Sequence, residues 1–186
     1  MGTRGLLGIR KNGDDKATYN HFDSYPSYLG KHTLEFIAEH KSELNKLYDN
    51  IILVDNNSEP TDEQVKECEK YTDLSVSEQS TKDWYCLLHN SQGDLTPYLN
   101  GLRYMIDNKN FIKDSLFCEY AYIINLDDNV LEFWIGFQKT PTEDNRYGVE
   151  KEDGYYPCKN VLNIPLDEIK ADKIDELVEK MEKCEG

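Results

Sequence analysis

The chain has 186 residues, of which 38% are hydrophobic and 11% aromatic. This composition is enough to fill the core of one domain spanning 1–186, and it excludes global disorder. No run of about 18 apolar residues occurs, which excludes a membrane-spanning helix, and the first residues lack the apolar core of a secretory signal. We therefore expect a soluble, cytoplasmic protein.

The formal net charge is −15, from 21 Lys and Arg residues against 36 Asp and Glu residues. Binding to a phosphate backbone requires clustered cations, and no basic stripe is present, so direct binding to nucleic acid is not expected. The acidity is spread over the later segments, since residues 1–50 are neutral overall while residues 51–100 carry 10 acids and 3 bases. Two interpretations remain open: a solvated acidic surface, or an inhibitor that imitates nucleic acid and occupies a basic protein surface.

The five cysteines predict neither a disulfide framework nor a zinc site, because they are scattered, odd in number and never spaced as C-x-x-C. We expect reduced thiols, with Cys118 as a small core residue. His32 and His40 lie eight residues apart on a predicted helix, which is too far for one metal ion. No glycine-rich phosphate loop is present, so no metal or cofactor is expected.

The first fifty residues predict a hairpin followed by a long helix. Residues 5–10 and 16–22 have the pattern of two strands, and Asn12-Gly13 between them favours a tight turn because both residues tolerate positive φ angles. Tyr25-Pro26-Ser27 ends the second strand, since proline cannot donate to the ladder. Residues 29–49 then carry apolar side chains at helical spacing.

The remainder of the chain mixes short helices and strands. Thr61 with Gln64 predicts a capping box that opens an acidic helix, and a further helix is expected around Trp84. Strands are expected at 51–54, 117–126, 131–137 and 160–164, and helices at 96–106 and at the amphipathic C-terminal end. This order predicts an α+β fold with a mainly antiparallel sheet flanked by helices.

The densest polar cluster, Tyr19-Asn20-His21-Phe22-Asp23-Ser24-Tyr25, follows the second strand. In a hairpin the start of the first strand lies beside the end of the second, which brings residues 3–4 beside residues 20–23. An arginine facing a carboxylate and an amide suits a small anionic or amide-containing ligand.

We therefore predict a ligand-binding site with Arg4 as an anion fork, Asn20 and His21 as hydrogen-bonding groups, Asp23 as orienter or acceptor, and Tyr25 as an aromatic wall. The alternative is that Arg4 and Asp23 form a purely structural ion pair.

Four motifs resemble an uncharacterised family found in bacteria and their phages. They are Met1-Gly2-Thr3-Arg4-Gly5, the run from Tyr19 to Pro26, Asp83-Trp84-Tyr85 with Gln92-Gly93-Asp94, and the run from Asp114 to Tyr122. The resemblance covers most of the chain, and it implies an association with phages but no activity.

The first 28 residues are also remotely similar to the opening of N-terminal-nucleophile amidohydrolases of the choloylglycine-hydrolase kind. In those enzymes a freed Cys, Ser or Thr begins a strand, a hairpin follows, and the second strand ends in Asn-x-Asp. Here Asn20 and Asp23 only approximate that pattern, and Gly2 has no side chain with which to attack. Thr3 would serve only after removal of Gly2. This similarity implies a layered αββα sandwich more than it implies a hydrolase.

Three functions follow as expectations. The first is a non-enzymatic binding protein, such as a phage-type inhibitor or a sponge for a nucleotide signal, which acts on a host defence system through a small ligand or a host protein. The second is an amidohydrolase built on the first hairpin. The third is an acidic inhibitor that imitates nucleic acid.

Overall fold

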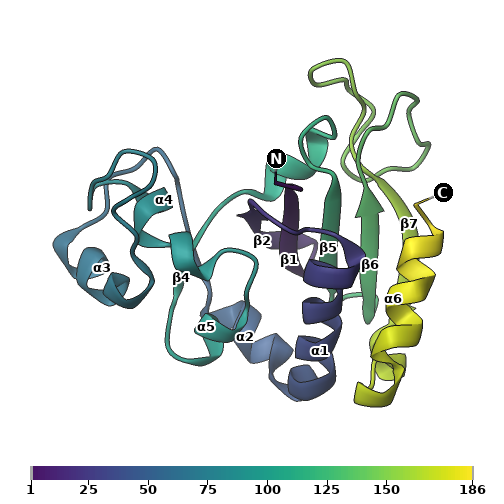
Figure 1. Cartoon of the computed structure of the whole chain (residues 1–186), viewed down its shortest axis with the longest axis horizontal. Helices are drawn as coiled ribbons and strands as arrows, with labels where there is room; N and C mark the ends of the chain where they lie inside the picture. The colour runs from purple at the N-terminus through teal and green to yellow at the C-terminus, as the bar shows by residue number, and fades with distance from the viewer. Residues whose placement is uncertain (1, 186) are drawn as a thin grey trace.

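The computed structural model describes residues 2–185, and its centre is a five-stranded sheet (Figure 1). The strands lie in the order β2-β1-β5-β6-β7, and only the β1–β5 pair is parallel. Their bounds are β1 Gly5–Lys11, β2 Asp14–Asn20, β5 Tyr120–Asn125, β6 Val130–Ile135 and β7 Lys159–Pro165. The fold is therefore α+β with a mostly antiparallel sheet, as the sequence predicts. Within the described residues no helix combines the length and the apolar character that crossing a membrane requires.

The hairpin of β1 and β2 forms around the predicted turn. Asn12 and Gly13 both have positive φ angles, 54° and 75°, which suit a tight turn. Their backbone N–H groups donate to the Asp127 carboxylate at 2.7 and 2.8 Å, and this ties the turn to the β5–β6 connection. Gly5 pairs with Asn20 across the hairpin, so the start of β1 does lie beside the end of β2.

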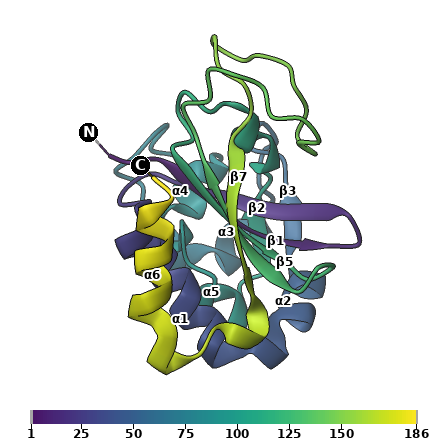
Figure 2. The same ribbon diagram turned by 90° about the vertical axis from the view of Figure 1, so that its right-hand side faces the viewer.

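The two faces of the sheet are covered by different kinds of structure. Alternating residues such as Leu7 and Ile9 pack beneath helices α1 (Lys31–His40) and α6 (Ile174–Lys183), which lie on one side of the sheet (Figure 2). The opposite face packs against the segments 107–119 and 137–158 rather than against a second sheet. The structure therefore does not confirm the layered αββα sandwich that the amidohydrolase similarity implies.

Two buried carboxylates, Asp15 and Glu132, and their partly exposed partners fasten the segment 137–158 to that second face. Glu132, only 4% exposed, accepts from Arg146 through Nη1 at 2.6 Å and Nη2 at 2.5 Å. The Tyr147 hydroxyl donates to the Asp15 carboxylate at 2.7 Å and accepts from Arg146 at 2.9 Å. Arg10 Nη1 completes the set by donating to Asp15 at 3.0 Å. We call these five residues the loop-side network.

The predicted helix at 29–49 is wrong as a single element. A π-helical turn at Pro26–Gly30 precedes α1, and a 3₁₀ turn at Lys41–Glu43 separates α1 from α2 (Leu44–Asn50). The break re-aims the chain so that Leu34 in α1 and Leu44 in α2 are both buried in the same core.

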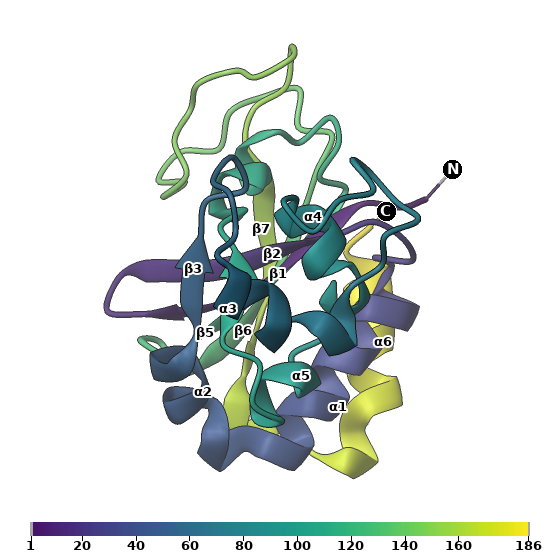
Figure 3. The ribbon, with the colours of Figure 1, turned by 90° about the vertical axis from the view of Figure 1, so that its left-hand side faces the viewer.

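The segment 51–106 forms a small substructure beyond β2, and it faces the viewer in Figure 3. Its elements are β3 Ile52–Val54, α3 Asp62–Glu67, α4 Trp84–Leu87, α5 Thr96–Leu99 and β4 Tyr104–Ile106. The Thr61–Gln64 capping box is present, as predicted. The predicted helix at 96–106 is wrong beyond residue 99, because Gly101 turns the chain with φ 104° and β4 pairs with β3.

Several strand boundaries differ from the prediction, since β2 begins at Asp14 instead of residue 16 and β7 extends one residue further at each end than 160–164. The second strand stops at Asn20 instead of residue 22, where the Asn20 side chain donates to Phe22 and Ser24 in the turn that follows, and Asp23 takes a left-handed conformation with φ 54°. The third sheet strand begins at Tyr120 instead of residue 117. All five cysteines are free, and Cys118 is fully buried in the core, as the sequence predicts.

Candidate functional site

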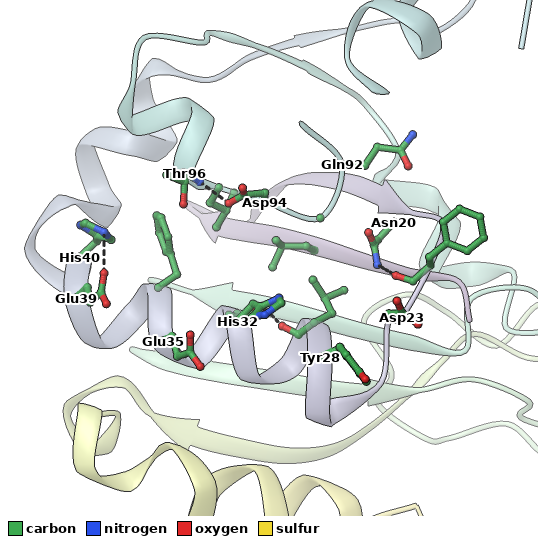
Figure 4. A pocket seen from close by; sticks show the side chains of 17 residues that line it. Asn20, Asp23, Tyr28, His32, Glu35, Glu39, His40, Gln92, Asp94 and Thr96 are labelled. Carbon is green, nitrogen blue, oxygen red and sulfur yellow. Dashed lines mark hydrogen bonds and ion pairs between the residues drawn. The ribbon is translucent and has the colours of Figure 1, made fainter. Parts of the chain in front are cut away.

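An open cavity of about 530 Å³ lies between the end of β2, helix α1 and the loop 92–96 (Figure 4). This volume lies within the range of about 300–1,000 Å³ that is typical of ligand sites. Its lining residues are Leu7, Asn20, Phe22, Asp23, Tyr28, Leu29, His32, Thr33, Glu35, Phe36, Glu39, His40, Gln92, Gly93, Asp94, Leu95 and Thr96.

Helix α1 supplies one wall through its helical periodicity. Leu34 and Ile37 are completely buried against the sheet. His32, Glu35 and Glu39 follow one another at intervals of three and four residues, so they share the face that borders the cavity.

The hairpin supplies the second wall. Asn20 Nδ2 donates to the Phe22 carbonyl at 2.6 Å and to Ser24 Oγ at 2.9 Å, and these bonds shape the turn after β2. Gly93 lies directly against this side chain, because a Cβ atom at residue 93 would come within 2.3 Å of Asn20 Oδ1. The glycine, which has φ 67°, thus lets the loop 92–96 close over Asn20.

The loop 92–96 supplies the third wall. The backbone N–H of Thr96 donates to Asp94 Oδ1 at 2.9 Å, which holds this carboxylate at the start of α5. Leu95, 2% exposed, packs into the core beneath it. Asp94 therefore faces the cavity from the wall opposite Glu35 (Figure 4).

The cavity is strongly acidic. Four carboxylates line it, from Asp23, Glu35, Glu39 and Asp94, and no Lys or Arg is among the lining residues. Within residues 2–185 the ion pairs of the lining are those of His40, with Glu39 at 3.6 Å and Glu43 at 2.6 Å. Asp23, Glu35 and Asp94 thus face the hollow without a cationic partner in this part of the chain.

Two of the five predicted site residues, Asn20 and Asp23, line the cavity, while Arg4, His21 and Tyr25 do not. The Arg4 guanidinium lies over the Phe117 ring at 5.3 Å from its centroid. Among residues 2–185 no ion pair joins Arg4 to Asp23: Asp23 lines the cavity, whereas Arg4 lies over Phe117. The predicted anion fork therefore lies outside the cavity.

His21 and Tyr25 have local partners instead. His21 Nδ1 lies 2.5 Å from the Tyr19 hydroxyl oxygen. The His21 ring packs edge-on against the Phe22 ring, with 4.3 Å between the ring centroids. Burial, followed by the charges of Arg4 and His89, lowers the pKa of His21, which favours the neutral ring. Tyr25 is 43% exposed, and its carbonyl accepts from the N–H groups of Tyr28 and Gly30.

The N-terminal segment is closely packed where an amidohydrolase would need its nucleophile. A Cβ atom at Gly2 would lie 2.5 Å from the His21 carbonyl oxygen and 2.4 Å from Phe22 Cδ1. Thr3 is 5% exposed, and its carbonyl accepts from the Ser24 N–H at 3.2 Å. A side chain at position 2 would therefore require this segment to move.

Within residues 2–185 no three or more His, Cys, Asp or Glu side chains lie close enough together to hold a metal ion. The cavity lining thus presents hydrogen-bonding and negatively charged groups without an assembled metal centre. These groups can accept hydrogen bonds and attract positive charge.

Sequence reasoning missed most of the acidic lining. The polar spacing of Glu35 and Glu39, on the same predicted helix as His32 and His40, was the available signal. Asp94 carried no such signal, because its position depends on how the loop 92–96 packs over the hairpin.

The resemblances to an uncharacterised bacterial and phage family and to N-terminal-nucleophile hydrolases rest on the motifs alone and stay predictions. No protein-family model, curated protein sequence or solved structure was found to match this chain.

Proposed function

We propose that this chain is a non-enzymatic binding protein whose ligand occupies the cavity between β2, α1 and the loop 92–96. The observation that carries the proposal is the cavity itself, in which carboxylates from three separate segments surround buried Leu29, Phe36 and Leu95. Ligand sites are typically concave and partly apolar, with a few polar groups that fix the orientation of the ligand.

Two versions of this function differ in their ligand. A sponge for a nucleotide signal needs cations to receive phosphate, whereas the cavity presents Asp23, Glu35 and Asp94 without lysine or arginine in its lining. These carboxylates suit an inhibitor that binds to a positively charged surface of a host protein. We therefore favour the inhibitor version, directed at a component of a host defence system.

The amidohydrolase receives less support from the geometry. The nucleophile in that mechanism is the side chain of the first residue after processing. Gly2 has none, and the space that such a side chain would need is taken by the His21 carbonyl and the Phe22 ring.

A variant that fills the cavity tests the proposal. Thr96 is exposed on the rim, so Thr96→Trp should fill part of the hollow without disturbing the core. Thr81→Trp is the matched control, because Thr81 is also exposed and is not among the cavity residues. The measurement is the melting midpoint with a panel of nucleotides, amines, and neutral, basic and acidic peptides.

A cavity ligand at about 100 times its Kd stabilises the folded state by about 2.7 kcal/mol, which raises the midpoint. We expect the rise in the native chain and in Thr81→Trp, and its loss in Thr96→Trp. A rise of equal size in Thr96→Trp, or no rise with any member of the panel, would contradict the proposal.

A further inference from the structure

Helix α1 separates the cavity from a second open hollow of about 420 Å³. The second hollow lies between α1 and the start of α6, where its lining includes Ala171, Asp172, Ile174 and Asp175. Glu35 and Glu39 line both hollows, so the two hollows adjoin on either side of one ridge of α1. We call the two hollows together the α1 groove.

The α1 groove is predominantly negatively charged along its length. The carboxylates of Asp172 and Asp175 at one end continue the series formed by the four carboxylates of the cavity. Lys31 is the cation of this lining, and its Nζ lies 3.6 Å from Asp175. Glu35 and Glu39 are one turn apart on the same helix, so their like charges repel each other until a cation lies between them.

Two exposed aromatic rings lie at the hairpin end of the α1 groove. Phe22 is 58% exposed and Tyr28 is 53% exposed, and both line the cavity beside Asp23. Large aromatic side chains in such positions are enriched at protein interfaces. A ring beside a carboxylate suits a guanidinium, which can stack on the ring and form a bidentate contact with the carboxylate.

We propose that the α1 groove binds an arginine-bearing segment of a partner protein. An extended chain can place one basic side chain in each hollow and cross the ridge of Glu35 and Glu39 between them. The complementary charge attracts any basic segment, and the exposed rings select arginine over lysine. This inference rests on the proposed function, because it names the chemistry of the ligand in the same cavity.

The test measures fluorescence anisotropy of two labelled nine-residue peptides, one alternating arginine with glycine and the other alternating lysine with glycine. The groove variant combines Asp23→Asn, Glu35→Gln and Glu39→Gln. The control variant combines Asp144→Asn, Glu63→Gln and Glu69→Gln, which removes the same charge from exposed positions elsewhere. Asp144 matches Asp23 because both have a positive φ, 61° and 54°, which asparagine also tolerates.

We expect the groove variant to bind the arginine peptide about tenfold more weakly than the native chain, and the control variant to stay within about twofold. The native chain should prefer the arginine peptide to the lysine peptide by about fivefold, and Tyr28→Ser should reduce that preference. Equal loss in the groove and control variants would overturn the inference, because it would indicate general acidity. Equal affinity for the two peptides would also overturn it.

A competitor separates a protein segment from a small polycation. Spermine, a linear polyamine, should displace the arginine peptide only at concentrations well above that of unlabelled peptide. Displacement at equal concentrations would overturn the inference in favour of a small amine. One result would overturn this inference while the proposed function stands. In it the arginine peptide does not bind, whereas a neutral ligand binds to the native chain and fails to bind to Thr96→Trp.

Discussion

The loop-side network and the α1 groove use the same carboxylate chemistry in opposite ways. In the loop-side network, Glu132 and Asp15 are 4% and 5% exposed, and each meets a guanidinium within 3.0 Å. In the α1 groove, Asp23, Glu35 and Asp94 face a hollow and have no cationic partner within residues 2–185. A buried charge must be paired to be tolerated, whereas a charge at an open hollow can remain solvated.

This difference in pairing indicates a structural role for the carboxylates of the loop-side network and supports the binding role that we propose for those of the α1 groove. The loop-side network holds the long segment 137–158 on the sheet, so its charges should contribute to stability. In the α1 groove, Glu35 and Glu39 carry like charges one turn apart on α1, and Glu35 has no ion-pair partner within residues 2–185, so neutralising Glu35 should leave the fold unharmed. Substitutions on the two sides of the molecule should therefore have effects of opposite sign.

The largest effect is expected for Arg146→Ala. Glu132 would lose both of its guanidinium contacts while Asn125 and Trp134 still donate to it at 3.1 and 3.3 Å. An uncompensated buried carboxylate costs about 3 kcal/mol of unfolding free energy. Urea denaturation followed by tryptophan fluorescence measures this loss.

The matched control removes the carboxylate together with its partner. Arg146→Met with Glu132→Gln should recover much of the stability, because no charge is left buried and the Gln carbonyl can still accept from Trp134. Equal stability of Arg146→Ala and the native chain would show that the loop-side network does not hold the segment 137–158.

An intermediate effect is expected for Tyr147→Phe. Burial, reinforced by Asp15, raises the pKa of Tyr147, so the hydroxyl stays protonated and donates to Asp15. Removal of the hydroxyl leaves Arg10 as the remaining partner of Asp15 in the network. The free energy of unfolding should fall by about 1.5 kcal/mol, since hydrogen bonds to charged groups contribute about that much. A decrease in the urea midpoint without a change in slope would confirm this; an unchanged midpoint would indicate that water replaces the hydroxyl.

The smallest effect, and the one of opposite sign, is expected for Glu35→Gln. It removes the repulsion between Glu35 and Glu39 on α1 and should stabilise the chain by about 0.3 kcal/mol at low salt. The gain should shrink as salt screens the native repulsion. Melting curves at two salt concentrations measure it, and a destabilised variant would mean that Glu35 has a structural role.

Local signals in the sequence predicted local structure well. Asn12-Gly13 identified the hairpin turn because its positive φ angles are a property of those two residues. Thr61 with Gln64 identified a helix start, because both members of a capping box lie within one helical turn and can be recognised from the sequence alone.

Elements defined by distant contacts were beyond the reach of that reasoning. Met105 and Ile106 fit a helical pattern, but pairing with β3 makes them a strand. The parallel pairing of β1 with β5 has no local signature at all. Asn20 and Asp23 could be predicted as site residues from their position at the end of the second hairpin strand. Glu35 and Asp94 line the same hollow only because of tertiary packing.

The parallel β1–β5 pair also determines how the chain reaches its native state. Gly5 pairs with Tyr120, so an interior strand of the sheet has its parallel partner more than a hundred residues later in the sequence. Closing so long a connection is entropically slow, and until then the hairpin carries an unpaired inner edge that includes Leu6, Leu7 and Ile9. We therefore expect pairing of β1 with β5, rather than formation of the hairpin, to limit the refolding rate, and aggregation to be most favoured before this pair forms.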